Sequence, residues 1–401
     1  MATTAEQQRG QATVTASAPA ASSLVVCSLE EWGTVRRRIR IMVDELVSMD
    51  PALRVLYVTP AVDVPFEIRS GRFAGLARPR LHQVHPRVHV LRPRKWLPRA
   101  LGPAADRSLG RQVARAVDGL GLTDPLVWVN DASYARFALS TGWPTIYDVT
   151  DDWLLAPLPP RQEARLRADD ELLLARSGAV VVCSPDLART RGRRRDVDLI
   201  PNGVDIELFA RPQPRPVELP ASPVAVYVGT LHEERIDVPL LLALAEARPD
   251  VQIALVGPDS LGPATSAQLA GVPTIHLLGP QPYDRVPGFL QHADLVVIPH
   301  LVNPFTESLD PIKAYECVVA GRPTVATPVA GFRDLGDPVV VCDRSEFVSV
   351  ASELLDSAVD TATAAARTPG EATPVAVASW RQRAESMDAV MQRVRSAAVA
   401  P

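Results

Sequence analysis

Hydrophobic residues in this chain come in short continuous runs that alternate with stretches of helical periodicity. From Ser23 to about residue 205 the runs are LVVC, RVLYVT, RVHVL, LVWVN, TIYDV, AVVVC and DLIPNG. A run without polar positions is typical of a strand buried on both faces, and such strands joined by helices form a doubly wound parallel sheet. Residues 23–205 are therefore predicted to form one Rossmann-like α/β domain.

The same alternation restarts after a proline-rich segment, RPQPRPVELPASP at 211–223, which lacks any period and suits a linker. The second series comprises VAVYVG, VQIALVG, TIHLLG, LVVIP, PTVAT and VVVC. We assign residues 206–375 to a second Rossmann-like domain and expect the two sheets to face each other across a cleft, where ligands bind beyond the strand ends. Residues 376–401 have helical periodicity and could pack back on the first domain.

Composition and charge are consistent with two globular domains and argue against several classes of function. The chain has 401 residues, of which 47% are hydrophobic and 22% charged, and its formal net charge is -4. Without a basic excess, a nucleic acid partner is not expected. Residues 1–22 lack the apolar region of a signal peptide and are interpreted as a disordered tail, and no run approaches the length of a membrane span. The scattered cysteines predict neither a zinc site nor disulfides, which suits the cytoplasm.

The segment at 306–327, TESLDPIKAYECVVAGRPTVAT, carries the most chemical information. Asp310 before Pro311 has the pattern of an N-cap with proline at the first helical position, and the predicted helix covers 311–320. The free amides and positive dipole end of such an N-terminus bind anions. Lys313 is one of only two lysines among 42 Lys and Arg residues, and it adds a charge suited to a diphosphate.

Glu316 lies three residues after Lys313, hence on the same face of the predicted helix. Its carboxylate could accept hydrogen bonds from both hydroxyls of a ribose while the lysine meets the phosphates. The alternative is that the two residues form an exposed ion pair, which contributes little. The rarity of lysine in this chain favours nucleotide binding.

At these residues the chain resembles the bacterial GT-B glycosyltransferases of family four, also called group 1. The resemblance rests on IPNGVDIELF at 200–209, YVGTLHEERID at 227–237 and DPIKAYECVVAGRPTVAT from Asp310, and it extends over nearly the whole chain from about Ser23. It implies the GT-B architecture and transfer of a hexosyl group from a nucleotide diphosphate sugar to a hydroxyl-bearing acceptor in carbohydrate biosynthesis. No cofactor is expected besides the donor. The reaction is expected to be metal-independent, because Lys313, Arg235 and the helix N-terminus would stabilise the leaving diphosphate in place of a divalent ion.

The resemblance also implies a set of donor-binding residues in the second domain. These are Gly229, Thr230, Arg235, Glu307, Ser308, Asp310, Lys313 and Glu316. Glu316 binds the ribose, Lys313 and Arg235 face the diphosphate, and the turn at Gly229 and Thr230 lets the donor approach the backbone.

One departure from the family concerns the donor sugar. The family commonly has two glutamates separated by seven residues, and counting back from Glu316 gives Ser308, with Glu307 beside it. A branch of the family with the motif DPxKxYE is similar to this sequence, and some of its relatives are inverting, so both stereochemical outcomes stay open. His232 and His300 follow strands of the second domain and could also touch the donor.

In the first domain, YDVTDDW ends a buried strand and brings Asp151 and Asp152 to the predicted cleft. Both are catalytic candidates, because a carboxylate there could orient an acceptor hydroxyl or, in an inverting enzyme, remove its proton. The alternative is that they only cap the next segment. Two adjacent carboxylates without a third ligand do not specify a magnesium site. Asp196 and Asp198 form a DxD string, which we interpret as the start of a strand.

The loop LEEWGTVRRR after the first strand resembles the acceptor-side loop of the same family. Trp32 is a candidate stacking platform, and Gly33 allows close approach to the backbone. Arg36, Arg37 and Arg38 are interpreted as a solvated basic face, since charge runs usually are.

The basic stretch at 87–99 could meet anionic lipid headgroups if the acceptor is membrane-bound, although plain surface is the simpler interpretation. We therefore expect a cytoplasmic protein that could touch the inner face of the membrane peripherally; nothing in the sequence indicates an oligomeric state. Two other functions stay open. One is a nucleotide-sugar epimerase or sugar phosphorylase of the same architecture. The other is a degenerate protein that only binds sugar nucleotides, which Ser308 makes conceivable.

Overall fold

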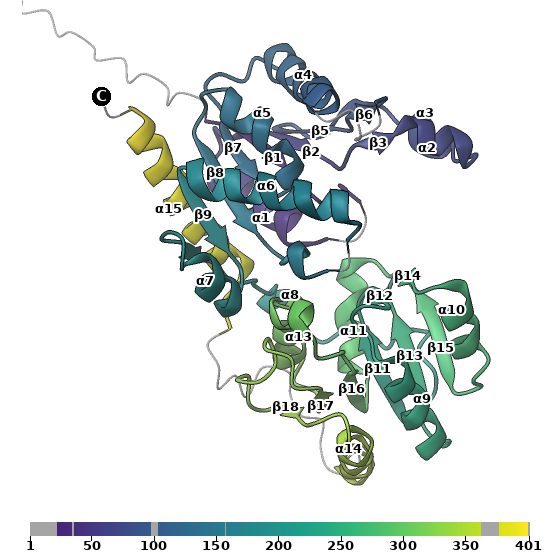
Figure 1. The fold of residues 1–401 in the computed structure, drawn as a ribbon. Helices are drawn as coiled ribbons and strands as arrows, with labels where there is room; N and C mark the ends of the chain where they lie inside the picture. The colour runs from purple at the N-terminus through teal and green to yellow at the C-terminus, as the bar shows by residue number, and fades with distance from the viewer. Residues whose placement is uncertain (1–21, 34–35, 98–102, 157, 362–376, 400–401) are drawn as a thin grey trace, which may run out of the picture.

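The chain forms two α/β domains, drawn one above the other in Figure 1. The computed structural model describes residues 22–33, 36–97, 103–156, 158–361 and 377–399. Nearly all of the predicted tail at 1–22, and most of the polar segment that follows the second domain, lie outside the described residues.

Eight strands form the sheet of the first domain. They are β1 (Ser23–Cys27), β2 (Arg54–Val58), β4 (Leu81–His85), β5 (Val88–Leu91), β7 (Leu126–Val129), β8 (Thr145–Val149), β9 (Ala179–Val182) and β10 (Asp198–Leu199). Their order is β10-β9-β8-β7-β1-β2-β5-β4, and all neighbours run parallel except β4, which is antiparallel to β5 at one edge. A separate short ladder joins β3 (Val62–Asp63) to β6 (Arg94–Lys95).

Helices cover both faces of this sheet. The helices of the domain are α1 (Arg38–Met49), α2 (Val64–Arg69), α3 (Ala74–Ala77), α4 (Pro103–Gly119), α5 (Ala135–Ser140), α6 (Pro160–Arg176) and α7 (Pro185–Arg191), of which α2 and α3 extend outward from its edge (Figure 1). In β1, Leu24 and Val26 belong to the core under α1, while Val25 and Cys27 belong to the core under α4, α5 and α6. Because each strand serves two cores, its sequence is continuously apolar.

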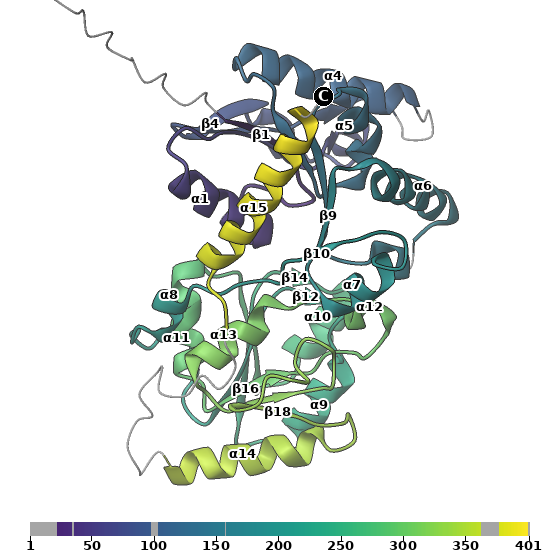
Figure 2. The same ribbon diagram turned by 90° about the vertical axis from the view of Figure 1, so that its left-hand side faces the viewer.

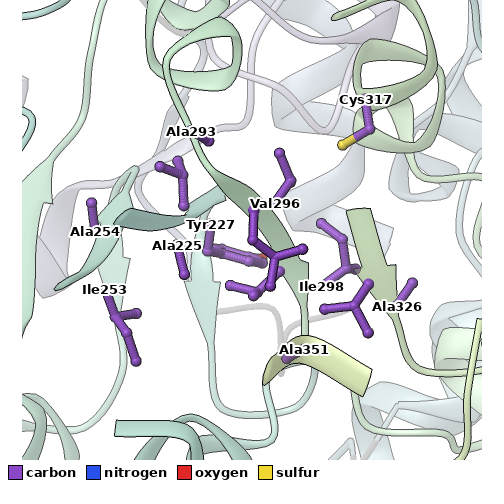
Figure 3. Close-up of a cluster of buried hydrophobic side chains, with 14 of the residues drawn as sticks. Ala225, Tyr227, Ile253, Ala254, Ala293, Val296, Ile298, Cys317, Ala326 and Ala351 are labelled. Atoms are coloured by element: carbon purple, nitrogen blue, oxygen red, sulfur yellow. The ribbon is translucent and has the colours of Figure 1, made fainter. Parts of the chain in front are cut away.

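The second domain has a six-stranded parallel sheet in the order β15-β13-β11-β16-β17-β18. These strands are β11 (Val224–Val228), β13 (Gln252–Val256), β15 (Ile275–Gly279), β16 (Leu295–Ile298), β17 (Thr324–Ala326) and β18 (Val339–Val341), with β12 (Leu231–His232) and β14 (Asp259–Ser260) in a small ladder beside them. Figure 3 shows Tyr227, Val296 and Ile298 of this sheet packed in the core, with Cys317 nearby.

The helices of the second domain include the one that the sequence singled out. They are α8 (Ile206–Ala210), α9 (Val238–Ala247), α10 (Pro263–Ala270), α11 (Val286–Gln291), α12 (Pro304–Glu307), α13 (Ile312–Ala320) and α14 (Phe347–Thr361). The helix predicted over 311–320 is α13, but it begins one residue later because Pro311 is extended, with ψ of 118°. The prediction that Asp310 is its N-cap is therefore wrong. Gly321 ends it in the left-handed conformation, with φ of 68°.

The chain returns to the first domain at its last described helix, α15 (Trp380–Val399), which Figure 2 shows crossing that domain. The buried side chains of α15 recur every three or four residues, as an apolar helical stripe does. They are Trp380, Ala384, Met387, Val390, Met391 and Val394. The stripe packs with α1 in the core of the first domain, a position that the sequence had left open.

Candidate functional site

Lys313 lies where the strand ends of the second domain meet α13. Its Nζ donates a hydrogen bond to Tyr227 Oη at 2.6 Å, lies 3.4 Å from His300 Nε2 and sits 4.2 Å from the centre of the Tyr227 ring. Tyr227 is on β11 and His300 follows β16, so the lysine is held at the carboxyl end of the sheet, where open α/β sheets bind ligands.

Two glycines let the backbone come close to this lysine. Gly229 has φ of +143°, and a Cβ atom there would lie 2.5 Å from Lys313 Nζ. Gly257 has φ of +148°, and a Cβ there would lie 2.1 Å from the carbonyl oxygen of Gly229. Both positions therefore require glycine, while the approach of a donor to the backbone at Gly229 stays a prediction.

His300 is a neutral group beside two cations. Burial, followed by the charges of Lys313 and Arg235, holds the pKa of His300 well below its usual value. A neutral imidazole keeps one nitrogen free to accept a proton, which suits a neighbour of Lys313 Nζ. His232, by contrast, is half-buried and forms no side-chain hydrogen bond among the described residues.

Glu316 is a buried carboxylate without a hydrogen-bond partner in the described part of the chain. It is 7% exposed, and burial raises its pKa to about 7 although the charge of Lys313 opposes this. The structure thus excludes the exposed ion pair that was the alternative for these two residues. A carboxylate without partners among the protein's described groups can accept hydrogen bonds from a ligand's hydroxyls.

The two domains meet at Arg235 and Asp151. The Arg235 guanidinium lies 3.8 Å from Asp151 Oδ1 and 5.3 Å from the centre of the Phe305 ring. Asp151 follows β8 of the first domain. Burial raises the pKa of Asp151, while the charges of Arg235 and then Arg37 oppose the shift. The contact places a carboxyl of the first domain beside one of the cations predicted to face the diphosphate.

Asp152 has the capping role that the sequence analysis gave as its alternative. Its side chain accepts from Leu154 N in the 3-10 turn at Trp153–Leu155, and Oδ1 lies 3.0 Å from Arg191 Nη2. Its catalytic assignment therefore has less support than that of Asp151.

Ser308 and Glu307, the candidates for the donor sugar, are both engaged. Ser308 is fully buried, donates to Phe305 O at 2.7 Å, and its carbonyl accepts from Ser184 Oγ of the first domain at 2.7 Å. Glu307 pairs with Arg333 at 2.7 Å. Contact with a donor sugar stays a prediction for both, and for Ser308 it requires these bonds to be exchanged.

Asp310, another predicted donor-binding residue, is hydrogen-bonded to Tyr315 and Asn202, and its contact with a donor stays a prediction. Its carboxylate accepts from Tyr315 Oη at 2.6 Å and from the backbone N–H of Asn202, while Asn202 Nδ2 donates to the Asp310 carbonyl. Asn202 lies between β10 and α8, so these bonds tie the start of α13 to the connection between the domains.

Arg38 corrects the interpretation of the arginine run as a solvated face. Arg38 is 3% exposed, its Nη2 lies 3.6 Å from Asp148 Oδ1, and its Nη1 donates to Asn202 Oδ1 at 3.1 Å. Arg37 is exposed and Arg36 is half-exposed. A signal was present in the sequence, because Asp148 interrupts the apolar strand TIYDV and a buried acid needs a partner.

Trp32 and Gly33 lie on the first-domain side of the site. The Trp32 ring packs edge-on against Tyr57 at 4.9 Å between centroids, and the Arg40 guanidinium lies 4.8 Å from its centre. One face of the ring is thus covered in the ligand-free protein. No heavy atom lies within 4 Å of a Cβ built on Gly33, which leaves the backbone there open.

Glu30 is a site residue that the sequence analysis did not identify. Its Oε2 is buried and has no hydrogen-bond partner among the described residues. Burial raises the pKa of Glu30 to about 7; Arg37 opposes the shift and Asp151 adds to it. Glu30 and Asp151 therefore form a pair of carboxyl groups on the first-domain side.

Two negative observations apply to the described residues only. Among them, no group of three or more His, Cys, Asp or Glu side chains is arranged to hold a metal ion. No helix in that part of the chain is both long and apolar enough to cross a bilayer.

Asp198 starts β10, as interpreted from the sequence, and pairs with Arg393 of α15.

Comparison with known proteins shows what the second domain and the whole fold are similar to. Residues 222–357 match the family model "Glycosyl transferases group 1". A putative teichuronic acid biosynthesis glycosyltransferase, TuaH of Bacillus subtilis (strain 168), is 25% identical over 213 residues, which is 49% of this chain and 53% of that protein. The match thus spans about half the length of this curated relative.

Solved structures are similar over 94% of the chain. Anabaena HepE in complex with UDP and glucose has a TM-score of 0.58 at 18% identity, with 98% of that chain covered. The trehalose-6-phosphate synthase OtsA has a TM-score of 0.57 at 13% identity, with 96% covered. These neighbours have the GT-B fold, which confirms the fold prediction. The chain therefore has the GT-B fold, and its residues 222–357 are similar to the group 1 glycosyl transferases.

Proposed function

We propose that this protein is a glycosyltransferase that moves a sugar from a nucleotide diphosphate sugar to a hydroxyl-bearing acceptor. The observation that carries the proposal is the arrangement at α13, where Lys313, Gly229 and Glu316 offer a cation, a glycine turn packed against that cation and a carboxylate without a hydrogen-bond partner among the described residues, all at the carboxyl end of the sheet. The group 1 family match and the UDP and glucose bound by HepE support it.

The chemistry follows from the charges of the site. Breaking the bond between sugar and diphosphate leaves negative charge on the diphosphate, and Lys313 and Arg235 stabilise that charge before the reaction begins. Preorganised charges of this kind are among the largest contributions to catalysis. Glu316 accepts hydrogen bonds from the ribose hydroxyls, and the glycine turn at Gly229 lets the phosphates approach the main chain.

The acceptor side is proposed to use Asp151 and Glu30. A carboxyl with a pKa near 7, such as that of Glu30, is matched to proton transfer at neutral pH. Asp151 lies next to Arg235, so an acceptor hydroxyl bound to it would also lie near the donor's diphosphate. Trp32 and Gly33 are proposed to border the same acceptor site.

The reaction is further proposed to be metal-independent and cytoplasmic. Two cations beside the predicted diphosphate position support the first point, since they supply the charge that a divalent ion would otherwise provide. Transfer that continues at full rate in excess EDTA would agree with this, and loss of transfer that Mg²⁺ restores would contradict it.

A donor screen tests the proposed function directly. Thermal unfolding is followed with UDP, GDP, dTDP and ADP sugars, and a ligand at a hundred times its Kd stabilises the native state by about 2.7 kcal/mol. The stabilising donor is then incubated with and without acceptors. Transfer supports the proposal. Interconversion of the donor without an acceptor identifies an epimerase, phosphate-dependent sugar release identifies a phosphorylase, and binding without turnover identifies a degenerate binding protein.

A further inference from the structure

The surface of the first domain near α2 and α3 concentrates exposed apolar side chains. Of the fifteen large apolar side chains exposed among the described residues, seven lie within residues 64–97. The largest of them are Phe66 on α2, Phe73 just before α3 and Trp96 just after β6; Phe73 is 60% and Trp96 58% exposed. Single exposed apolar residues are ordinary, but a cluster indicates contact with another phase or partner.

The same segment is strongly basic although the chain is not. Residues 64–97 contain eight Lys and Arg and a single acid, Glu67, whereas the whole chain has a net charge of -4. Arg69, Arg72 and Arg78 are exposed and form no ion pair within 4 Å among the described residues. The Arg72 guanidinium lies 5.9 Å from the centre of the Phe66 ring, which places positive charge and aromatic surface side by side.

The contacts join these residues into one projecting surface. The parallel β3–β6 ladder pairs Asp63 with Lys95, so Trp96 follows β6 at the level where the chain leaves β3 and enters α2. Arg94 Nη2 donates to Leu76 O of α3 at 2.7 Å, which fixes α3 to β6. In Figure 1, α2 and α3 extend outward from the edge of the first domain.

We propose that α2, α3 and the end of β6 form a docking face for a bilayer surface that carries anionic lipid. Exposed arginines attract the lipid phosphates, and aromatic rings are favoured at the level of the headgroups. Aliphatic Ile68 on the same helix gains by leaving water for the acyl boundary, which a nucleic acid backbone does not offer. The face lies outside the donor-binding residues, so this proposal does not rest on the proposed enzymatic function.

Vesicle co-sedimentation of the full chain tests the docking face. The protein is mixed with phosphatidylcholine vesicles with or without about 30% phosphatidylglycerol, at low and at high salt. We expect partitioning onto the anionic vesicles, weakened by salt. Each arginine near such a surface contributes about fivefold in the partition coefficient, so the triple variant Arg69→Ser, Arg72→Ser, Arg78→Ser should bind about a hundredfold more weakly. Phe66→Ser with Phe73→Ser should weaken the binding that remains at high salt.

Matched variants keep the test specific. Arg176→Ser with Arg193→Ser removes exposed charge from α6 and from the turn after α7, and it should leave partitioning close to that of the parent. Thermal unfolding and nucleotide binding of every variant are expected to equal those of the parent, because these side chains are exposed and away from the cleft. Three results would each overturn the proposal. The first is equal binding to neutral and anionic vesicles, and the second is an equal loss of binding in both sets of arginine variants. The third is a protein that binds no vesicles but self-associates in a way that the phenylalanine substitutions abolish.

Discussion

The two sides of the cleft use charged side chains in opposite ways. On the second domain, Glu316 is buried without a hydrogen-bond partner among the described residues, and Lys313 meets only Tyr227 and His300. On the first domain, Arg38 is bound to Asp148 and Asn202, and Asp152 caps a turn and pairs with Arg191. Among the described residues, Lys313 and Glu316 of the second domain thus form no ion pair within 4 Å, whereas Arg38 and Asp152 of the first domain do.

This difference indicates which groups await a ligand. A buried polar group without a partner reduces stability and persists where function requires it, whereas a paired group is fully explained by the fold. Substitutions of Lys313 and Glu316 should therefore weaken ligand binding or transfer without lowering stability, and substitution of Arg38 should lower stability. Glu30 is an exception on the first domain, because its Oε2 is buried without a hydrogen-bond partner among the described residues, and together with Asp151 it carries the acceptor proposal.

The largest expected effect is the loss of stability in Arg38→Leu. Asp148 would stay buried without its cation, and breaking a buried pair in this way lowers the free energy of unfolding by about 3–5 kcal/mol. Urea unfolding measures it. Adding Asp148→Asn should recover part of the loss, because an amide still accepts from Trp128 Nε1, now 3.1 Å from Asp148. Arg167→Leu removes the exposed partner of Glu163 and should cost under about 1 kcal/mol. Equal effects of Arg38→Leu and Arg167→Leu would show that burial does not distinguish the two pairs.

Lys313→Ala should have the next largest effect, this time on transfer. Removing one preorganised charge beside the leaving diphosphate lowers kcat/KM by about a hundredfold to a thousandfold. The chain has one other lysine, Lys95, which pairs with Asp63 on the β3–β6 ladder and serves as the matched control. Steady-state kinetics with a water-soluble acceptor should leave Lys95→Ala unchanged. Similar kinetics for Lys313→Ala and the parent would remove the central support for the proposed function.

Glu316→Gln should change stability and affinity in opposite directions. The pKa of Glu316 is raised from 4.5 to about 7, so between these values the folded protein binds more protons than the unfolded chain and the free energy of unfolding falls as the pH rises. Above pH 7 the full cost of about 3 kcal/mol is present, at roughly 1.4 kcal/mol per pKa unit, and glutamine removes it.

The same variant should bind the donor nucleotide about tenfold more weakly, because hydrogen bonds to a charged group are lost. Urea unfolding at pH 5 and pH 8, together with nucleotide titration calorimetry, measures both effects. Glu353→Gln on the exposed face of α14 provides the control and should alter neither. A Glu316→Gln protein that is less stable than the parent at pH 8 would contradict the account.

Glu307→Gln should have the smallest effect on stability. Its partially exposed pair with Arg333 contributes no more than about 1 kcal/mol to the free energy of unfolding. Arg333→Gln removes the same pair and leaves the carboxylate in place. A larger loss of transfer in Glu307→Gln than in Arg333→Gln would assign the carboxylate to the donor sugar, and equal small losses would leave it a surface ion pair.

The sequence predicted the architecture well because each central strand has to serve two cores. The runs TIYDV and VAVYV coincide with β8 and β11, and apart from Thr145 and the ion-paired Asp148 they present apolar residues to both faces of the sheet. The edge strand β4 was missed because LHQVH is mostly exposed and pairs with one neighbour only. Local periodicity reports burial, and a strand that is not buried gives no such signal.

The site residues also differ in how well the sequence predicted them. Lys313 was identified because its residue type is rare in this chain, and Gly229 because a motif placed it in a turn. The roles of Arg38 and Glu30 depend on residues distant in sequence, such as Asp148 and Asp151, and no local pattern contains those distances. Asp310 was misassigned for a local reason, since the extended Pro311 delays the helix by one residue and frees the carboxylate for Asn202 and Tyr315.

The return of α15 to the first domain affects how the protein can fold during its synthesis. The core under α1 includes six side chains of α15, yet about 180 residues separate β10 from that helix. At about 5–20 residues per second, the ribosome needs roughly 9 to 36 seconds to make them. Throughout that interval the nascent first domain exposes an apolar groove, so the second domain can complete its core before the first one does.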